Sequence, residues 1–101
     1  MRIWHGWTTH DDAGAYIGFV RDDVFPEIEQ MEGARGAYLA RRDDGSEVEF
    51  VALTLWDSLE AVRAFAGEEY ERSVVPPRGR ELLSRFDERS AHYETVVEPY
   101  A

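Results

Sequence analysis

The sequence predicts a single α+β domain in which one antiparallel sheet carries its helices on one face. Three observations support this class. An Asp-Gly pair at residues 44–45 separates two strand-like segments, which is a strong hairpin signal. Two segments with helical spacing of apolar residues each follow a strand-like segment directly. The length of 101 residues suits one domain, and we expect residues 1–101 to form it.

The first two predicted elements are a strand and a long helix. Arg2–Thr9 (RIWHGWTT) is rich in aromatic and β-branched residues and is expected to form the strand. Thr9 is then a suitable N-cap, because two aspartates follow in the first helical turn. Apolar residues recur at helical spacing over residues 16–31, and Gly33 is expected to end the helix. Pro26 interrupts this run, so the helix should kink or begin a new turn there.

The middle of the chain predicts a hairpin followed by a second helix. Gly36–Arg42 and Glu47–Trp56 are the expected strands on either side of the turn. Asp57 is the expected N-cap of the helix, with Glu60 at its third position as in a capping box. The apolar face of this helix would consist of Leu59, Val62, Phe65 and Ala66.

The last part of the chain is predicted to be less regular. Arg78–Phe86 is expected to hold a helical turn or two, and His92–Val97 to form a short final strand. The resulting order is β-α-β-β-α-β with an added piece before the last strand, which is the pattern of ferredoxin-like folds. Right-handed crossovers then place the first and third strands in the centre of the sheet. The second strand would pair with the third, and the fourth with the first.

The third predicted strand is apolar on both of its faces. Its apolar residues are Val51, Leu53 and Leu55 on one parity and Phe50, Ala52 and Trp56 on the other. Two helices can cover only one face of the sheet, and an apolar sheet face needs cover from water. We therefore expect a homodimer that is joined sheet to sheet.

Residues 33–67, GARGAYLARRDDGSEVEFVALTLWDSLEAVRAFAG, resemble the central part of the antibiotic biosynthesis monooxygenase family of dimeric α+β barrels. The resemblance rests on the glycine-flanked entry to the second strand, the hairpin and the strand-Trp-Asp-Ser-helix-Phe-Ala-Gly run. In element order and length it covers residues 2–97. It implies a homodimer that forms a dimeric α+β barrel, with pockets between each sheet and its own helices. Members of the family include cofactor-independent oxygenases of phenolic or polyketide-like aromatics and haem-degrading enzymes.

The function that the resemblance implies is a cofactor-independent monooxygenase that oxidises a small phenolic, quinol or polyketide-like aromatic with O₂. Such a substrate reacts once deprotonated, so the site needs a base, a dry cavity and a firm hold on the ring. Histidine suits the role of base, and His5 and His92 are the candidate catalytic residues because their strands should be neighbours. The aromatic residues expected to bind the substrate are Trp4, Trp7, Tyr38, Trp56 and Tyr70.

Three other functions remain open. The chain could be a non-catalytic dimer that binds a small ligand or serves a structural role, because pocket aromatics look alike in binders and enzymes. Haem degradation has weak support, since that branch uses an asparagine and a histidine near the second helix. This chain has no asparagine, and no histidine between residues 11 and 91. A metal site at His5, His92 and Glu94 would lack a ligand-spacing motif.

Composition argues against several other function classes. The absence of cysteine and lysine excludes thiolate and Schiff-base chemistry. No glycine-rich phosphate loop follows a strand, so we expect no bound cofactor. A formal net charge of −10 disfavours binding to nucleic acid. No apolar run approaches the roughly 20 residues of a membrane span, and the N-terminus lacks a signal-peptide layout, so a cytoplasmic protein is expected.

Overall fold

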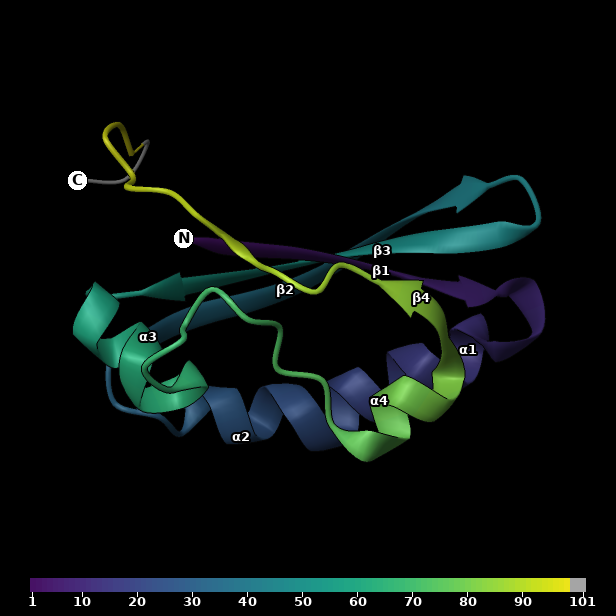
Figure 1. Cartoon of the computed structure of the whole chain (residues 1–101), viewed down its shortest axis with the longest axis horizontal. Helices are drawn as coiled ribbons and strands as arrows, with labels where there is room; N and C mark the ends of the chain where they lie inside the picture. Colours follow the sequence, from purple (N-terminus) through teal and green to yellow (C-terminus); the bar gives the residue numbers. More distant parts are fainter. Residues whose placement is uncertain (99–101) are drawn as a thin grey trace.

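The computed structural model describes residues 1–98, which form a sheet with a layer of helices along one face (Figure 1). The strands are β1 (Arg2–Thr9), β2 (Ala34–Asp44), β3 (Glu47–Trp56), β4 (Leu83–Phe86) and β5 (Ala91–His92). Their order is β2-β3-β1-β4, with β5 also paired to β1, and all pairings are antiparallel. The predicted central position of the first and third strands is confirmed. This α+β arrangement is compatible with a ferredoxin-like fold.

All the helices of residues 1–98 lie on the same side of the sheet (Figure 1). They are α1 (His10–Phe19), the π-helical turn η1 (Val20–Val24), α2 (Phe25–Glu29), α3 (Leu59–Ala66) and α4 (Pro77–Leu82). Within that part of the chain, no helix is both long and apolar enough to cross a membrane. The opposite face of the sheet carries no helix in the described residues.

The long helix predicted after β1 is present as three consecutive pieces, α1, η1 and α2. Thr9 caps α1 as predicted, and its hydroxyl accepts a hydrogen bond from the Asp12 N–H at 3.2 Å. In η1 the Phe25 N–H reaches back five residues to the Val20 carbonyl. Pro26, which has no N–H to donate, then lies in the first turn of α2. The new turn that the sequence predicts at Pro26 is therefore found.

The helix α3 begins differently from the prediction. Its N-cap is Ser58 and not Asp57, because Ser58 has extended backbone angles and its hydroxyl accepts from the Ala61 N–H at 3.2 Å. The Asp57 carboxylate instead pairs with Arg35 of β2. The Asp57 N–H donates to the Gly33 carbonyl at 2.8 Å. Asp57 thus ties the start of α3 to the start of β2 and leaves the capping role to its neighbour.

The C-terminal strand is also placed differently. Residues 83–86, expected to be helical or irregular, form β4, and the strand predicted over His92–Val97 is reduced to Ala91–His92. Tyr93 still exchanges backbone hydrogen bonds with Met1. Because β1 starts at Arg2, the residues after Tyr93 run past the edge of the sheet and form no strand up to residue 98.

The packed core lies between the sheet and the helices. Phe50 of β3 is fully buried, and its ring lies 4.9 Å from that of Tyr16 in α1. Ala13, Val20, Val48, Leu82 and Leu83 complete this cluster. Tyr16 and Val20 of this cluster also line the cavity described next, so the cavity adjoins the core.

Candidate functional site

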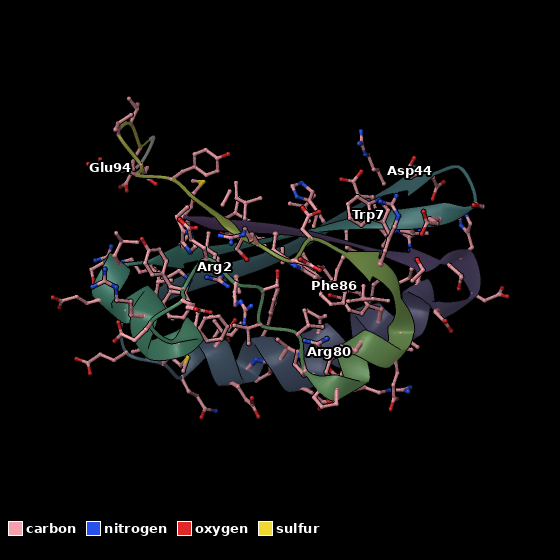
Figure 2. All side chains as sticks on the ribbon, in the orientation of Figure 1. Arg2, Trp7, Asp44, Arg80, Phe86 and Glu94 are labelled. Atoms are coloured by element: carbon pink, nitrogen blue, oxygen red, sulfur yellow. The ribbon has the colours of Figure 1, made fainter. Side chains whose placement is uncertain are left out.

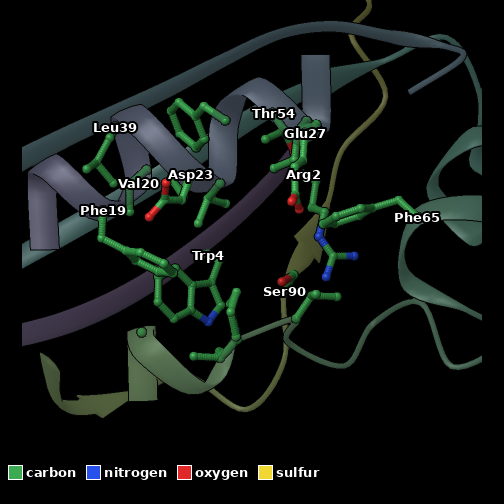
Figure 3. A pocket seen from close by; sticks show the side chains of 18 of the residues that line it. Arg2, Trp4, Phe19, Val20, Asp23, Glu27, Leu39, Thr54, Phe65 and Ser90 are labelled. Atoms are coloured by element: carbon green, nitrogen blue, oxygen red, sulfur yellow. The ribbon is translucent and has the colours of Figure 1, made fainter. Parts of the chain in front are cut away.

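A cavity of about 320 Å³ lies between the inner face of the sheet and the helices (Figure 3). Its walls are mostly apolar and aromatic, from Trp4, Phe19, Phe25, Leu39 and Phe65. Its polar lining side chains are Arg2, Asp23, Glu27, Thr54 and Ser90. The cavity therefore combines a hydrophobic body with charged and hydroxyl groups at its edges.

The alternation of side chains along β1 places Arg2 and Trp4 on the cavity side. Arg2 pairs with Thr54 and Trp4 with Ala52 in the β1–β3 register, and all four residues line the cavity. The Trp4 indole N–H donates to the Asp87 carbonyl at 2.9 Å, and the Trp4 ring lies 6.2 Å from that of Phe86. These contacts fix the indole as a wall of the cavity.

Arg2 is a buried cation at one end of the cavity, with only 5% of its surface exposed. Its guanidinium donates to the backbone carbonyls of Tyr70 and Arg72, the latter at 2.9 Å. It also lies 5.6 Å from the centre of the Phe65 ring. Burial lowers the pKa of Arg2, but an arginine stays protonated at neutral pH. No carboxylate of residues 1–98 lies within ion-pair distance of it.

Ser90 adds an unpaired hydroxyl to the same lining. Its side chain is buried, and its Oγ has no hydrogen-bond partner among the described residues. The Ser90 N–H donates to the Glu71 carbonyl at 2.6 Å, so the residue is held by the same segment that Arg2 anchors. Buried hydroxyls are nearly always hydrogen-bonded in proteins, so a buried hydroxyl without a partner beside a cavity needs an explanation.

Carboxylates line the cavity from the helix side. Asp23 lies on η1 and Glu27 on α2 (Figure 3). Neither forms an ion pair with an arginine or histidine of residues 1–98. Both acidic residues are exposed to solvent, so the cavity has a buried cation on its sheet side and two solvated acidic groups on its helix side.

Only one of the seven predicted site residues, Trp4, lines this cavity. His5, Trp7 and Tyr38 lie on the outer face of the sheet, away from the helices, and Figure 2 shows Trp7 on that side and Arg2 and Phe86 on the other. His5 stacks on Trp7 with ring centres 6.4 Å apart. Its two ring nitrogens lie 3.4 Å from the Asp87 carboxylate and 3.9 Å from that of Glu49.

The remaining predicted residues lie beside the cavity without lining it. The His92 Nε2 lies 3.0 Å from an Arg2 nitrogen, and its ring meets the Tyr70 ring edge-on at 5.1 Å. Burial, with the Arg2 charge as a smaller cause, lowers the pKa of His92. Trp56 stacks on Phe65 at 5.2 Å and donates to the Thr54 hydroxyl at 2.8 Å. Its ring borders a separate hollow between α3 and residues 92–98, which His92 also lines.

The two predicted catalytic histidines are therefore not brought together. His5 lies on the outer face of the sheet, whereas His92 pairs with Arg2 at the start of β1. Among residues 1–98 no group of three or more histidine or acidic side chains is arranged to hold a metal ion.

Sequence reasoning missed the polar lining of the cavity. Arg2 carried a usable signal, because it shares its parity on β1 with Trp4, Gly6 and Thr8, and a lone charge on a buried parity needs an explanation. Asp23 and Glu27 stand in a helix with many exposed acids, so nothing in the pattern separates them. Ser90 lies in a stretch without periodicity and carried no signal.

Comparison of the chain with protein-family models and with curated proteins finds no match. Membership of the antibiotic biosynthesis monooxygenase family therefore stays a prediction. The same holds for the dimeric barrel and the activity that the resemblance implies.

Proposed function

We propose that this protein binds one small, largely apolar molecule in the cavity between its sheet and its helices. The observation that carries the proposal is the cavity itself, about 320 Å³ beside a closely packed core. Ligand pockets range over roughly 300–1,000 Å³ and combine apolar walls with a few placed polar groups. This cavity lies at the small end of that range, which suits a ligand of about one to three rings.

Filling the cavity tests this proposal. Ala52 lies on the inner face of β3 and lines the cavity, so Ala52→Leu adds three carbons to space that is otherwise empty. We expect Ala52→Leu to abolish binding of bicyclic aromatic ligands in calorimetric titrations, while stability changes by no more than about 2 kcal/mol. Ala64→Leu, on the exposed side of α3, is the matched control and should bind as the wild type does. Equal binding by both variants would locate the ligand elsewhere.

Assembly as a homodimer through the outer face of the sheet is the second part of the proposal. Ile3, Val51, Leu53 and Leu55 lie on that face, beside a Tyr38 side chain that is 62% exposed. Soluble monomers rarely expose a continuous apolar sheet face. Sheet-to-sheet pairing of two copies would give the dimeric α+β barrel expected from the resemblance.

Oxygenation of a phenolic, quinol or polyketide-like aromatic without a cofactor is a second candidate function. One observation favours it, which is that the cavity combines possible bases, Asp23 and Glu27, with an anion stabiliser, Arg2. A carboxylate would take the acidic proton of an anthrone CH₂, and the resulting anion would reduce O₂. The product is the ketone, and one water leaves for each O₂ consumed. Oxygen uptake with a hydroxyanthrone, lost in Asp23→Asn or Glu27→Gln, would separate an oxygenase from a binding protein.

A further inference from the structure

We propose that the ligand of the cavity carries a carboxylate, and that three hydrogen-bond donors at one end of the cavity hold it. This inference rests on the proposed binding function and names its ligand class. The donors, called the donor cluster below, are Arg2, Thr54 and Ser90. Arg2 and Thr54 are direct partners in the β1–β3 register, so their side chains leave the inner face next to one another. Ser90 immediately precedes β5, whose His92 pairs with Arg2.

The charge of Arg2 is the first argument. Backbone carbonyls of Tyr70 and Arg72 satisfy some of its N–H groups, but none of them neutralises the cation. A buried charge without a counter-ion is costly, and no carboxylate of residues 1–98 lies within 4.0 Å of the guanidinium. An anionic ligand group in the cavity would supply the counter-charge. Three of the five guanidinium N–H groups already donate, to Tyr70, Arg72 and His92, which leaves two for a carboxylate.

The two hydroxyls of the donor cluster are the second argument. The Ser90 Oγ has no partner among residues 1–98, although only 6% of the residue is exposed. The Thr54 hydroxyl already accepts a hydrogen bond from the Trp56 indole, which leaves its own proton to be donated. Figure 3 shows Ser90 near the Arg2 guanidinium, and Thr54 farther along the cavity beside Glu27. A carboxylate can accept about four hydrogen bonds, so it could engage the whole cluster.

The acidic residues on the helix side set the orientation of the ligand. Asp23 and Glu27 are exposed to solvent and would repel a carboxylate only weakly, but this repulsion still favours placing the anionic group at the sheet side with Arg2, and the rings beside Trp4 and Phe19. This arrangement predicts that one substitution in the cavity increases ligand affinity, whereas most substitutions in a binding site decrease it. Glu27→Gln removes a repulsive charge and should tighten the binding of a carboxylate without changing that of a neutral analogue.

The experiment compares 2-naphthoate with 2-naphthamide, which has the same rings and no charge, by calorimetric titration of the full chain. We expect the wild type to bind 2-naphthoate at least about tenfold more tightly, because hydrogen bonds to charged groups are the stronger ones. Arg2 also anchors residues 70–72, so its substitution could disturb the fold. The decisive variants are therefore Ser90→Ala and Glu27→Gln.

Ser90→Ala should weaken 2-naphthoate by about tenfold and leave the melting temperature unchanged or higher, because the deleted hydroxyl has no partner in the protein. Ser84→Ala is the matched control. The Ser84 hydroxyl bonds the Glu47 carboxylate at 2.6 Å and the Trp7 carbonyl at 3.1 Å on the outer side. Its loss should lower stability and leave ligand affinity unchanged.

Each outcome supports or overturns the inference. Preference for 2-naphthoate, reduced in Ser90→Ala and increased in Glu27→Gln, supports it. Equal affinity for the two probes overturns the carboxylate assignment and leaves the binding function standing. Unchanged 2-naphthoate affinity in Ser90→Ala overturns the donor cluster. Failure of both probes to bind the wild type overturns the binding function and this inference together.

Discussion

Trp4 can form a wall of the cavity only because the residue two positions along β1 is a glycine. Positions i and i+2 of a strand share one face, so the Trp4 indole lies over Gly6. A Cβ atom at Gly6 would lie 2.5 Å from the Trp4 Cη2 atom and 3.0 Å from the Leu83 Cδ2 atom. Movement of either neighbour is opposed, because Leu83 is buried and a shift of the indole would break its hydrogen bond to the Asp87 carbonyl. Gly6 therefore determines where the cavity begins.

A matched pair of glycine substitutions tests this role. Gly6→Ala should lower the free energy of unfolding by about 1–3 kcal/mol, because it overpacks a filled region. Gly14→Ala should raise it by about 0.5–1 kcal/mol, since Gly14 lies inside α1 with nothing within 4 Å of its Cβ position. Urea denaturation of the two variants and the wild type measures both values. A Gly6→Ala protein as stable as the wild type would show that the indole is free to move.

The candidate site could be predicted only in part, and β1 shows why. Trp4 was predicted and lines the cavity, whereas His5 and Trp7 have the opposite parity and point to the outer face. Alternation alone says that Trp4 and His5 cannot share a face. Which set of alternate residues faces the helices depends on tertiary packing. In the structure it is the set that includes Trp4 and the fully buried Thr8. Ser90 is placed by a backbone hydrogen bond to Glu71, which no local pattern encodes.

At the scale of elements, the sequence patterns predicted correctly those elements that local interactions stabilise. The strands β1 and β3 have the predicted bounds, and the hairpin turn is closed by Gly45 at a φ of +63°. In contrast, β4 is four residues long and directly follows α4. It is a strand because it pairs with Gly6, Trp7 and Thr8 of β1, which lie 75 to 80 residues earlier in the chain. Such long-range pairing overrides the weak helical preference of its sequence.

The start of α3 gives a prediction at this scale. Ser58→Ala should lower the free energy of unfolding by about 1 kcal/mol, because the Ala61 N–H loses its partner. Asp57→Ala should cost less, about 0–1 kcal/mol, since its ion pair with Arg35 is largely exposed to water. Thermal or urea unfolding of both variants compares the two costs. A larger loss of unfolding free energy in Asp57→Ala than in Ser58→Ala would indicate that Asp57 is the N-cap.

At the scale of the whole molecule, the sheet has one covered and one uncovered face (Figure 1). The uncovered face is not uniform. Near the start of β1 it is apolar, with Ile3, Leu53 and Leu55, and near the hairpin it is charged, with an Arg42–Glu49 ion pair of 2.7 Å. An apolar area with a polar border is the usual composition of a protein interface. We expect a second copy of this chain, related by a two-fold axis, to cover this face.

The resulting prediction concerns the mass in solution. We expect analytical ultracentrifugation to find a dimer at micromolar concentration, and Leu53→Glu to give a folded monomer, because it would bury an unpaired charge in the interface. Ala64→Glu on the exposed side of α3 adds the same charge away from that face and should stay dimeric. Each chain carries a net charge of −10, so the dimer should tighten as salt is added. A wild-type monomer at these concentrations, or equal masses for the two variants, would contradict pairing through this face. If the wild type is a dimer and the monomeric Leu53→Glu variant binds ligand normally, each cavity is complete within one chain, as its lining residues predict.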